Sequence, residues 1–332
     1  MASGFLRPSR SYLLGDLAAN NLEPPRHQDA KPVMRLRREV RTLFSVSSVV
    51  RLPLSCILAG MLVGVFGASA ALGEALTLGG RTVVLEPPAG YCALDPARPE
   101  EADIIAFSEK MQQPRNHVIM QLADCDELAD FRTGTRKRFD RYGQFFVPIS
   151  DGAVMIPTGY SRASMLAEAA NEFPKLDSGA VVDDVANKLR QNADGNVSGL
   201  HFLGVLKQDD AGLYLGIAVG KTTIANQTVY AGAMGVVGLT LVNQVPVSLG
   251  LYQANVGAEA VPDLLSKVQE TLASLVQGNA ESEAREGSTR WSWHGFDLEA
   301  LARAALIGGL IGAAIGLAGW AWSRRRKNRA GS

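Results

Sequence analysis

The stretch GVVGLTLVNQVPVSLGLY, residues 235–252, decides the fold. It contains two apolar runs, Gly235–Val242 and Val245–Tyr252, separated by the dipeptide Asn243-Gln244. In the second run apolar residues fall on every other position, which is typical of a strand with one buried face. A two-residue connection with Asn where positive φ is needed predicts a tight antiparallel hairpin.

The elements on either side extend this pattern toward the N-terminus and the C-terminus. A second hairpin is predicted from His201–Lys207 and Leu213–Val219, which flank a polar turn with Gly. The other expected elements are strands at Arg81–Leu85, His117–Ala123 and Gln144–Ile149, and helices at Pro99–Gln113, Ser161–Phe173, Val181–Arg190 and Pro262–Gly278. We therefore expect an α+β fold, an antiparallel sheet covered by helices, over residues 76–278.

Charge is distributed unevenly along the chain, although its formal net charge is zero. Residues 1–75 carry a net charge of +4, residues 76–302 a net charge of −10, and residues 303–332 a net charge of +6. Lys and Arg next to apolar segments resist translocation across a membrane. The pattern predicts an acidic domain outside the cytoplasm between two basic cytoplasmic ends.

The first apolar segment, residues 52–75, has the features of an export signal. Residues 52–73 carry no charge, they follow an Arg-rich stretch, and they end near Ala68-Ser69-Ala70. This order predicts a secretory signal, and the length also suits a retained signal-anchor, so cleavage stays open. Residues 1–51 are then a basic and disordered cytoplasmic region, within which Met34 is a possible true start.

The second apolar segment, residues 303–323, is predicted to be a transmembrane helix. Residues 304–322 are uncharged, Trp residues flank them, and the basic tail 324–332 follows. Residues 279–302 are then a polar tether and interfacial segment. Gly308, Gly312 and Gly316 repeat every four residues, a spacing that favours close helix packing and a homo-oligomer. The alternative is a helix buried in the core of the domain.

Two of the three cysteines lie in the exported part. Cys92 and Cys125 are predicted to form a disulfide, because thiols are oxidised outside the cytoplasm, and two free buried thiols are the alternative. Cys56 lies inside the first apolar segment. Metal ligation would need more ligands than His117 offers nearby, so we expect no metal.

The sequence contains no complete catalytic or cofactor motif. Gly159–Ala163 resembles a nucleophile elbow with Ser161 as a weak candidate nucleophile, but the last Gly is replaced by Ala. Ser161 is more simply the N-cap of the helix that follows. Gly216–Thr222 is one residue short of a phosphate-binding loop. We therefore expect no cofactor.

One charged cluster stands out in the acidic domain. It is the basic patch, which consists of Arg132, Arg136, Lys137, Arg138 and Arg141, with aromatic residues between them. Such a patch attracts anionic partners, while a solvated loop is the plainer interpretation. Nucleic acid is not expected outside the cytoplasm.

These observations together favour one function over two others. The leading hypothesis is a membrane-anchored, non-catalytic periplasmic domain of the bacterial-type inner membrane. Its partner would be an envelope protein or an anionic envelope component. The alternatives are a periplasmic serine hydrolase that uses Ser161 and a small-molecule sensor domain.

Overall fold

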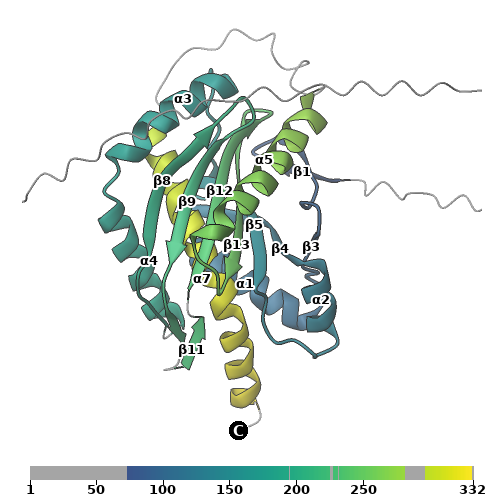
Figure 1. Cartoon of the computed structure of the whole chain (residues 1–332). Helices are drawn as coiled ribbons and strands as arrows, with labels where there is room; N and C mark the ends of the chain where they lie inside the picture. Colours follow the sequence, from purple (N-terminus) through teal and green to yellow (C-terminus); the bar gives the residue numbers. More distant parts are fainter. Residues whose placement is uncertain (1–72, 194, 225–226, 231, 281–295, 331–332) are drawn as a thin grey trace, which may run out of the picture. The chain divides into compact units, whose positions relative to one another are not determined.

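The computed structural model describes residues 73–193, 195–224, 227–230, 232–280 and 296–330, with side chains of the last helix described as far as Ala314. Residues 52–72 of the first apolar segment therefore lie outside the described residues, and only its last three residues, 73–75, are described. The centre of the fold is one antiparallel sheet in the order β3-β4-β5-β13-β12-β9-β8, with β6 paired to β5 (Figure 1). Two smaller sheets, β1-β2 and β11-β10-β7, accompany it.

The strands of the large sheet are β3 (Tyr91–Ala93), β4 (Asn116–Asp124), β5 (Arg141–Ser150), β6 (Ala153–Val154), β8 (His201–Gln208), β9 (Leu213–Val219), β12 (Ala233–Val242) and β13 (Val245–Ala254). The smaller sheets contain β1 (Glu74–Leu78), β2 (Arg81–Leu85), β7 (Gly195–Val197), β10 (Thr222–Ile224) and β11 (Gln227–Tyr230). The helices are α1 (Pro99–Gln112), α2 (Cys125–Arg132), α3 (Arg162–Glu172), η1 (Phe173–Lys175), α4 (Ser178–Ala193), η2 (Ala258–Ala260), α5 (Val261–Gly278) and α7 (Leu298–Ala330).

The two predicted hairpins are confirmed. Strands β12 and β13 pair from Ala233↔Ala254 to Val242↔Val245, so only two residues connect them. Those residues, Asn243 and Gln244, have φ angles of 50° and 63°. Positive φ at both positions is what a two-residue turn between twisted strands requires. Strands β8 and β9 form the other hairpin.

Each face of the sheet is covered by different elements. Helix α5 and the β1-β2 hairpin pack on one face, where Leu264, Val268 and Leu272 join the core. Helices α1, α3, α4 and α7 pack on the other face. Figure 1 shows α5 and α7 on opposite sides of the central strands. The predicted α+β class is therefore confirmed.

Helix α7 differs from its prediction as a transmembrane helix. Every residue from Leu301 to Ala314 except Arg303 is buried, and α7 contacts β5, β9, β10, β12, β13, α1, α3, α4 and η1. The first half of the segment predicted to leave the domain is thus the central helix of its core. Within the part of the chain that the structure describes, no helix has the length and apolar character needed to cross a bilayer.

Glycines let α7 lie directly on the sheet. A Cβ at Gly308 would collide with the ring of Phe146, and one at Gly309 would lie 2.6 Å from Ile217 Cδ1 and 2.7 Å from Val237 Cγ2. These side chains are fully buried and belong to strands at the middle of the sheet. The glycine spacing therefore serves close packing within the chain.

Polar side chains also hold α7, and they do so through its backbone. Gln112 Nε2 and Gln144 Nε2 donate to Gly308 O at 2.9 and 3.2 Å. Asn116 Nδ2 donates to Ala304 O at 2.9 Å, and Tyr142 OH donates to Ala313 O at 2.6 Å. All four side chains are at most 1% exposed. Gln112, Asn116, Tyr142, Gln144, Phe146, Ile217, Val237 and Tyr252, the residues beneath α7, are called the α7 slot below.

Candidate functional site

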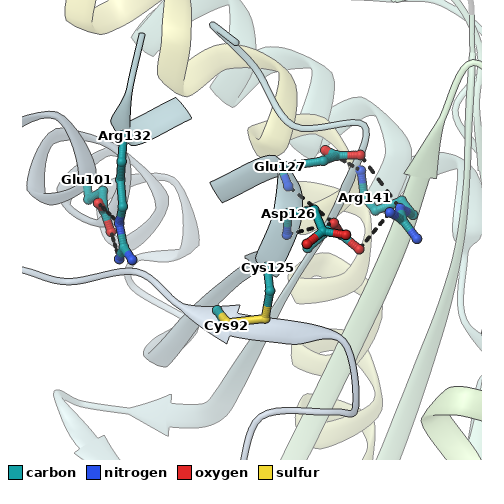
Figure 2. The surroundings of a disulfide bond; sticks show 8 residues. Cys92, Glu101, Cys125, Asp126, Glu127, Arg132 and Arg141 are labelled. Carbon is teal, nitrogen blue, oxygen red and sulfur yellow. Dashed lines mark hydrogen bonds and ion pairs between the residues drawn. A yellow bond between two sulfur atoms is a disulfide. The ribbon is translucent and has the colours of Figure 1, made fainter. Parts of the chain in front are cut away.

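The predicted disulfide is present and joins β3 to the first residue of α2. The Cα atoms of Cys92 and Cys125 are 5.0 Å apart, and 33 positions separate them in the sequence. Helix α2 begins here because Asp124 accepts hydrogen bonds from the backbone N–H groups of Asp126 and Glu127. Figure 2 shows the disulfide surrounded by carboxylates and the arginines that face them.

Arg132 of the basic patch forms an ion pair with a buried carboxylate. Its Nε and Nη2 donate to the two oxygens of Glu101 at 2.8 and 2.9 Å, a bidentate geometry (Figure 2). Glu101 is 1% exposed and also accepts from the backbone N–H of Asp95 at 2.7 Å. The hydrogen bond to Glu101 raises the pKa of Arg132. Arg132 is therefore a structural partner of the interior, since removing it would leave a buried charge unpaired.

Arg141 and Arg136 face a second group of acids around the start of α2. Arg141 Nη2 lies 2.7 Å from Asp124 Oδ2. Its Nε lies 3.6 Å from Glu127 Oε1 (Figure 2). Arg136 Nη1 lies 3.0 Å from Asp140 Oδ2 and 3.5 Å from Glu127 Oε2. Glu127 is largely buried and also accepts the backbone N–H of Asp140 at 2.7 Å. This group fixes α2 against the start of β5.

The basic patch is thus largely neutralised by carboxylates of the same domain. Arg138 Nε also lies 4.0 Å from Asp140 Oδ1. Lys137 is exposed and forms no ion pair with any of the described residues. An anionic partner would compete with these internal pairs for the arginines, so the geometry does not single out the patch as a binding surface. Binding of an anionic envelope component there stays a prediction.

Ser161, the weak catalytic candidate, caps helix α3. Its Oγ accepts from the backbone N–H of Ser164 at 3.1 Å, and Ser164 Oγ accepts from the backbone N–H of Ser161 at 3.0 Å. The two hydroxyl groups are also hydrogen-bonded to each other at 3.0 Å. A reciprocal capping box explains the residue, and no acid or histidine among the described residues is hydrogen-bonded to Ser161 Oγ.

The described part of the chain contains no group of three or more His, Cys, Asp or Glu side chains placed to hold a metal. Of the three glycines proposed for helix packing, Gly308 and Gly312 contact Phe146 and Tyr252 of the α7 slot. The surroundings of Gly316 lie outside the described side chains. The partner of Gly308 and Gly312 is therefore the domain's own sheet, which corrects the predicted contact between membrane helices for these two residues.

A groove with a volume of about 530 Å³ lies between the second half of α5 and the connection from β2 to β3. Pro87, Pro88 and Ala89 line one side. Glu86 belongs to the same side, and polar residues of α5 line the other side, namely Lys267, Glu270, Thr271, Ser274 and Gln277. The α5 residues recur every three or four positions, which places them along one stripe of the helix.

The walls of this groove are fixed to each other by one side chain. Asn279, at the end of α5, is 3% exposed and accepts from Val84 N–H at 2.9 Å through Oδ1. Its Nδ2 donates to Val84 O at 3.0 Å and to Leu275 O at 2.8 Å. The amide thereby satisfies the backbone groups of Val84 at the free edge of β2 and ties the end of α5 to that strand.

Reasoning from the sequence missed this groove, although two signals were available. Pro87-Pro88 fixes an extended connection, and α5 has a polar stripe opposite its buried leucines. Neither signal shows that the two segments face each other, because almost two hundred residues separate them. A similarly long separation along the sequence is the reason why the polar contacts of the α7 slot were not predicted.

Comparisons with known proteins give little further information. No protein-family model matches the chain, and no curated protein matches it. The solved structures that match include the solution structure of cyanobacterial PsbP (CyanoP) from Synechocystis sp. PCC 6803. The match has 14% sequence identity, covers 64% of this chain and 98% of that chain, and has a TM-score of 0.28. A likeness with so low a TM-score carries no argument about fold or function.

Proposed function

We propose that this chain is a non-catalytic binding domain that works outside the cytoplasm and is held at the inner membrane by its N-terminal apolar segment. The observation that carries the proposal is the disulfide between Cys92 and Cys125. Disulfides form and persist in oxidising compartments and are rare in the cytosol. The Arg-rich stretch before residues 52–73 supports the same placement, because it resists export while the chain after it crosses.

The position of α7 favours a single anchor at the N-terminus. Leu301–Ala314 supplies the central helix of the domain, so this stretch belongs on the same side of the membrane as the sheet that it covers. The basic stretch 324–329 then follows the domain outside the cytoplasm. This proposal replaces the expected cytoplasmic C-terminus with an extracytoplasmic one.

Reporter fusions test this topology. A periplasmic phosphatase fused after Ser332 should be as active as one fused within the domain, and a fluorescent protein that folds only in the cytoplasm should stay dark at Ser332. Cytoplasmic fluorescence at Ser332 would overturn the single-anchor topology. A fusion after residue 51 is the cytoplasmic control.

The groove beside α5 is the better candidate for binding. Its hydroxyl, amide and carboxylate groups lie along one helix stripe beside a proline pair, which suits an extended peptide that needs both donors and acceptors. The charged groups at the groove are Glu86, Glu270 and Lys267, one carboxylate more than ammonium. We therefore propose that the ligand is an extended, neutral or basic peptide stretch of an envelope protein.

A displayed library of random peptides tests this second part of the proposal. Peptides selected on the wild-type domain should bind Ser274→Tyr at least about tenfold more weakly, a loss of about 1.4 kcal/mol, because the new ring fills the groove. The neighbouring Ala273 is exposed on α5 and does not line the groove, so Ala273→Tyr is the matched control. Equal loss in both variants, or no loss in either, would refute the groove as the binding site.

A further inference from the structure

Helix α7 continues well beyond the stretch that packs in the core. Its described side chains are buried as far as Ala314, and its backbone stays helical to Ala330. The 16 residues from 315 to 330, called the α7 arm below, extend for about 24 Å at about 1.5 Å per residue. Figure 1 shows this yellow part of α7 extending past the ends of the central strands. The fold therefore carries the end of the chain away from the sheet.

The α7 arm differs in composition from the rest of the chain. It begins with an uncharged stretch that contains Trp320 and Trp322. Five cations follow within six residues, namely Arg324, Arg325, Arg326, Lys327 and Arg329. No Asp or Glu comes after Glu299 in the sequence, so these cations have no acid one turn away on their own helix.

The chain thus has two clusters of basic residues, and the fold places them differently. Arg141 of the basic patch lies 2.7 Å from a carboxylate, and its neighbour Tyr142 donates to Ala313 O, so the paired patch lies beside the base of the arm. About 16 Å of helix separates Ala313 from Arg324. Exposed charges interact over about 8–10 Å at moderate ionic strength. The arm is longer than this range, so it carries its cations beyond the acids that neutralise the patch.

The distribution of these cations favours a lipid surface as their partner. At 3.6 residues per turn, five cations in six consecutive residues are spread around the whole circumference of the helix. An acidic groove on a protein would contact only part of that circumference, whereas lipid headgroups can surround the end of a helix. Tryptophan prefers the membrane–water interface, because its ring is apolar and its N–H is polar. Clusters of Lys and Arg are attracted to anionic lipids.

We propose that the end of the α7 arm docks on the anionic surface of a lipid bilayer. The cations lie among the phosphate headgroups, and Trp320 and Trp322 lie at the interface. This contact rests on the proposed attachment of the domain to a membrane and adds a second point to it. A chain attached at both its N-terminal segment and its C-terminal arm holds the domain in one orientation over the bilayer.

Fluorescence of the full-length chain in lipid nanodiscs tests the proposal. Ser323→Cys, with Cys56→Ser to remove the third thiol, takes an environment-sensitive label directly before the basic run, while Cys92 and Cys125 stay in their disulfide. In discs with equal parts of phosphatidylcholine and phosphatidylglycerol, the emission should shift to shorter wavelength. Discs of phosphatidylcholine alone should give no shift. Raising the salt from about 0.1 M to about 1 M, which shortens the screening length to about 3 Å, should reverse the shift.

Two variants with the same change in net charge separate docking of the arm from general attraction. The arm variant replaces three cations by Gln, namely Arg324, Arg325 and Arg326. The domain variant replaces three exposed lysines by Gln, namely Lys137, Lys175 and Lys207. Gln is about as good a helix former as Arg, so the arm stays helical. The arm variant should dock about a hundredfold more weakly, at roughly fivefold per cation, and the domain variant should dock as the original does.

Three results would overturn the proposal. One is the same emission in both lipid compositions, which would assign the basic run to a partner other than lipid. Another is an arm variant that docks as well as the original. The third is a shift in phosphatidylcholine alone that high salt does not reverse, because this indicates insertion of α7 into the bilayer. The nanodisc has two equivalent surfaces, so a failure of docking here is distinct from a failure of the topology, which the fusions at Ser332 report.

Discussion

Replacing Gly308 by Ala tests directly whether α7 belongs to the core of the domain. The new methyl group would meet the ring of Phe146, which is fully buried on a central strand and has no room to move. Overpacking of this kind costs about 1–3 kcal/mol. Moving α7 away to relieve the collision would stretch the bonds from Gln112 and Gln144 to Gly308 O, and losing one of these two bonds leaves a buried amide without its partner, which costs about 1–3 kcal/mol more.

The expected total is a loss of about 2–6 kcal/mol, a large part of the 5–15 kcal/mol that stabilises a typical domain. Urea unfolding of a fragment spanning residues 67–332, followed by circular dichroism, measures it. The urea midpoint should fall by about 0.7–2 M at an m-value of about 3 kcal/mol/M. Gly278→Ala is the matched control, because a Cβ at Gly278 has no heavy atom within 4 Å, and surface changes stay within about 0.5 kcal/mol. Equal midpoints for the wild type and Gly308→Ala would show that α7 lies outside the core.

Three further outcomes are expected. Replacing both cysteines of the disulfide by Ser should lower the free energy of unfolding by about 3–4 kcal/mol, as the entropy of a closed loop of this length predicts; a loss below about 1 kcal/mol in urea unfolding would contradict it. Arg132→Ala should lower the free energy of unfolding by about 2–3 kcal/mol, because Glu101 is left unpaired in the interior; this is less than the loss expected for a fully buried pair. Lys137→Ala is the control and should leave the thermal midpoint unchanged. The hydrogen bond to Glu109 raises the pKa of His117, so this pair contributes fully below about pH 6.5 and fades as the pH rises through the raised value. The difference in thermal midpoint between the wild type and His117→Gln should therefore become smaller as the pH rises from 6 to 8. A difference that grows with pH would show that the His117–Glu109 pair does not stabilise the domain in this way.

The sequence predicted best where the information is local. The β12–β13 hairpin depends on two neighbouring runs and the dipeptide between them, and the structure reproduces it with both turn residues at positive φ. Ser161 as the cap of α3 is equally local. The disulfide was predicted by a different route, because the part of the chain that we expect to be exported contains only two cysteines.

The prediction of residues 303–323 as a transmembrane helix differs from the structure for a physical reason. A transmembrane helix and the central helix of a domain are both largely apolar, so the uncharged run at residues 304–322 is compatible with either in a single sequence. What separates them is the presence of donors such as Gln112 and Gln144 beneath the helix. These residues lie more than 160 positions earlier in the chain, and a single sequence does not show which distant segments meet. The acids that neutralise the basic patch were missed for the same reason, since Glu101 lies 31 positions from Arg132.

The place of α7 at the end of the chain has a consequence for how the protein is made. The central sheet is complete in sequence at Ala254, but the helix that covers its middle ends its buried part at Ala314. At about 5–20 residues per second, the slot stands empty for several seconds during synthesis. The amides and hydroxyls of the α7 slot can bind water in that interval, which a purely aliphatic surface could not do. The incompletely synthesised domain therefore exposes less apolar surface through which it could aggregate. The polar lining that binds α7 thus also protects the chain before α7 arrives.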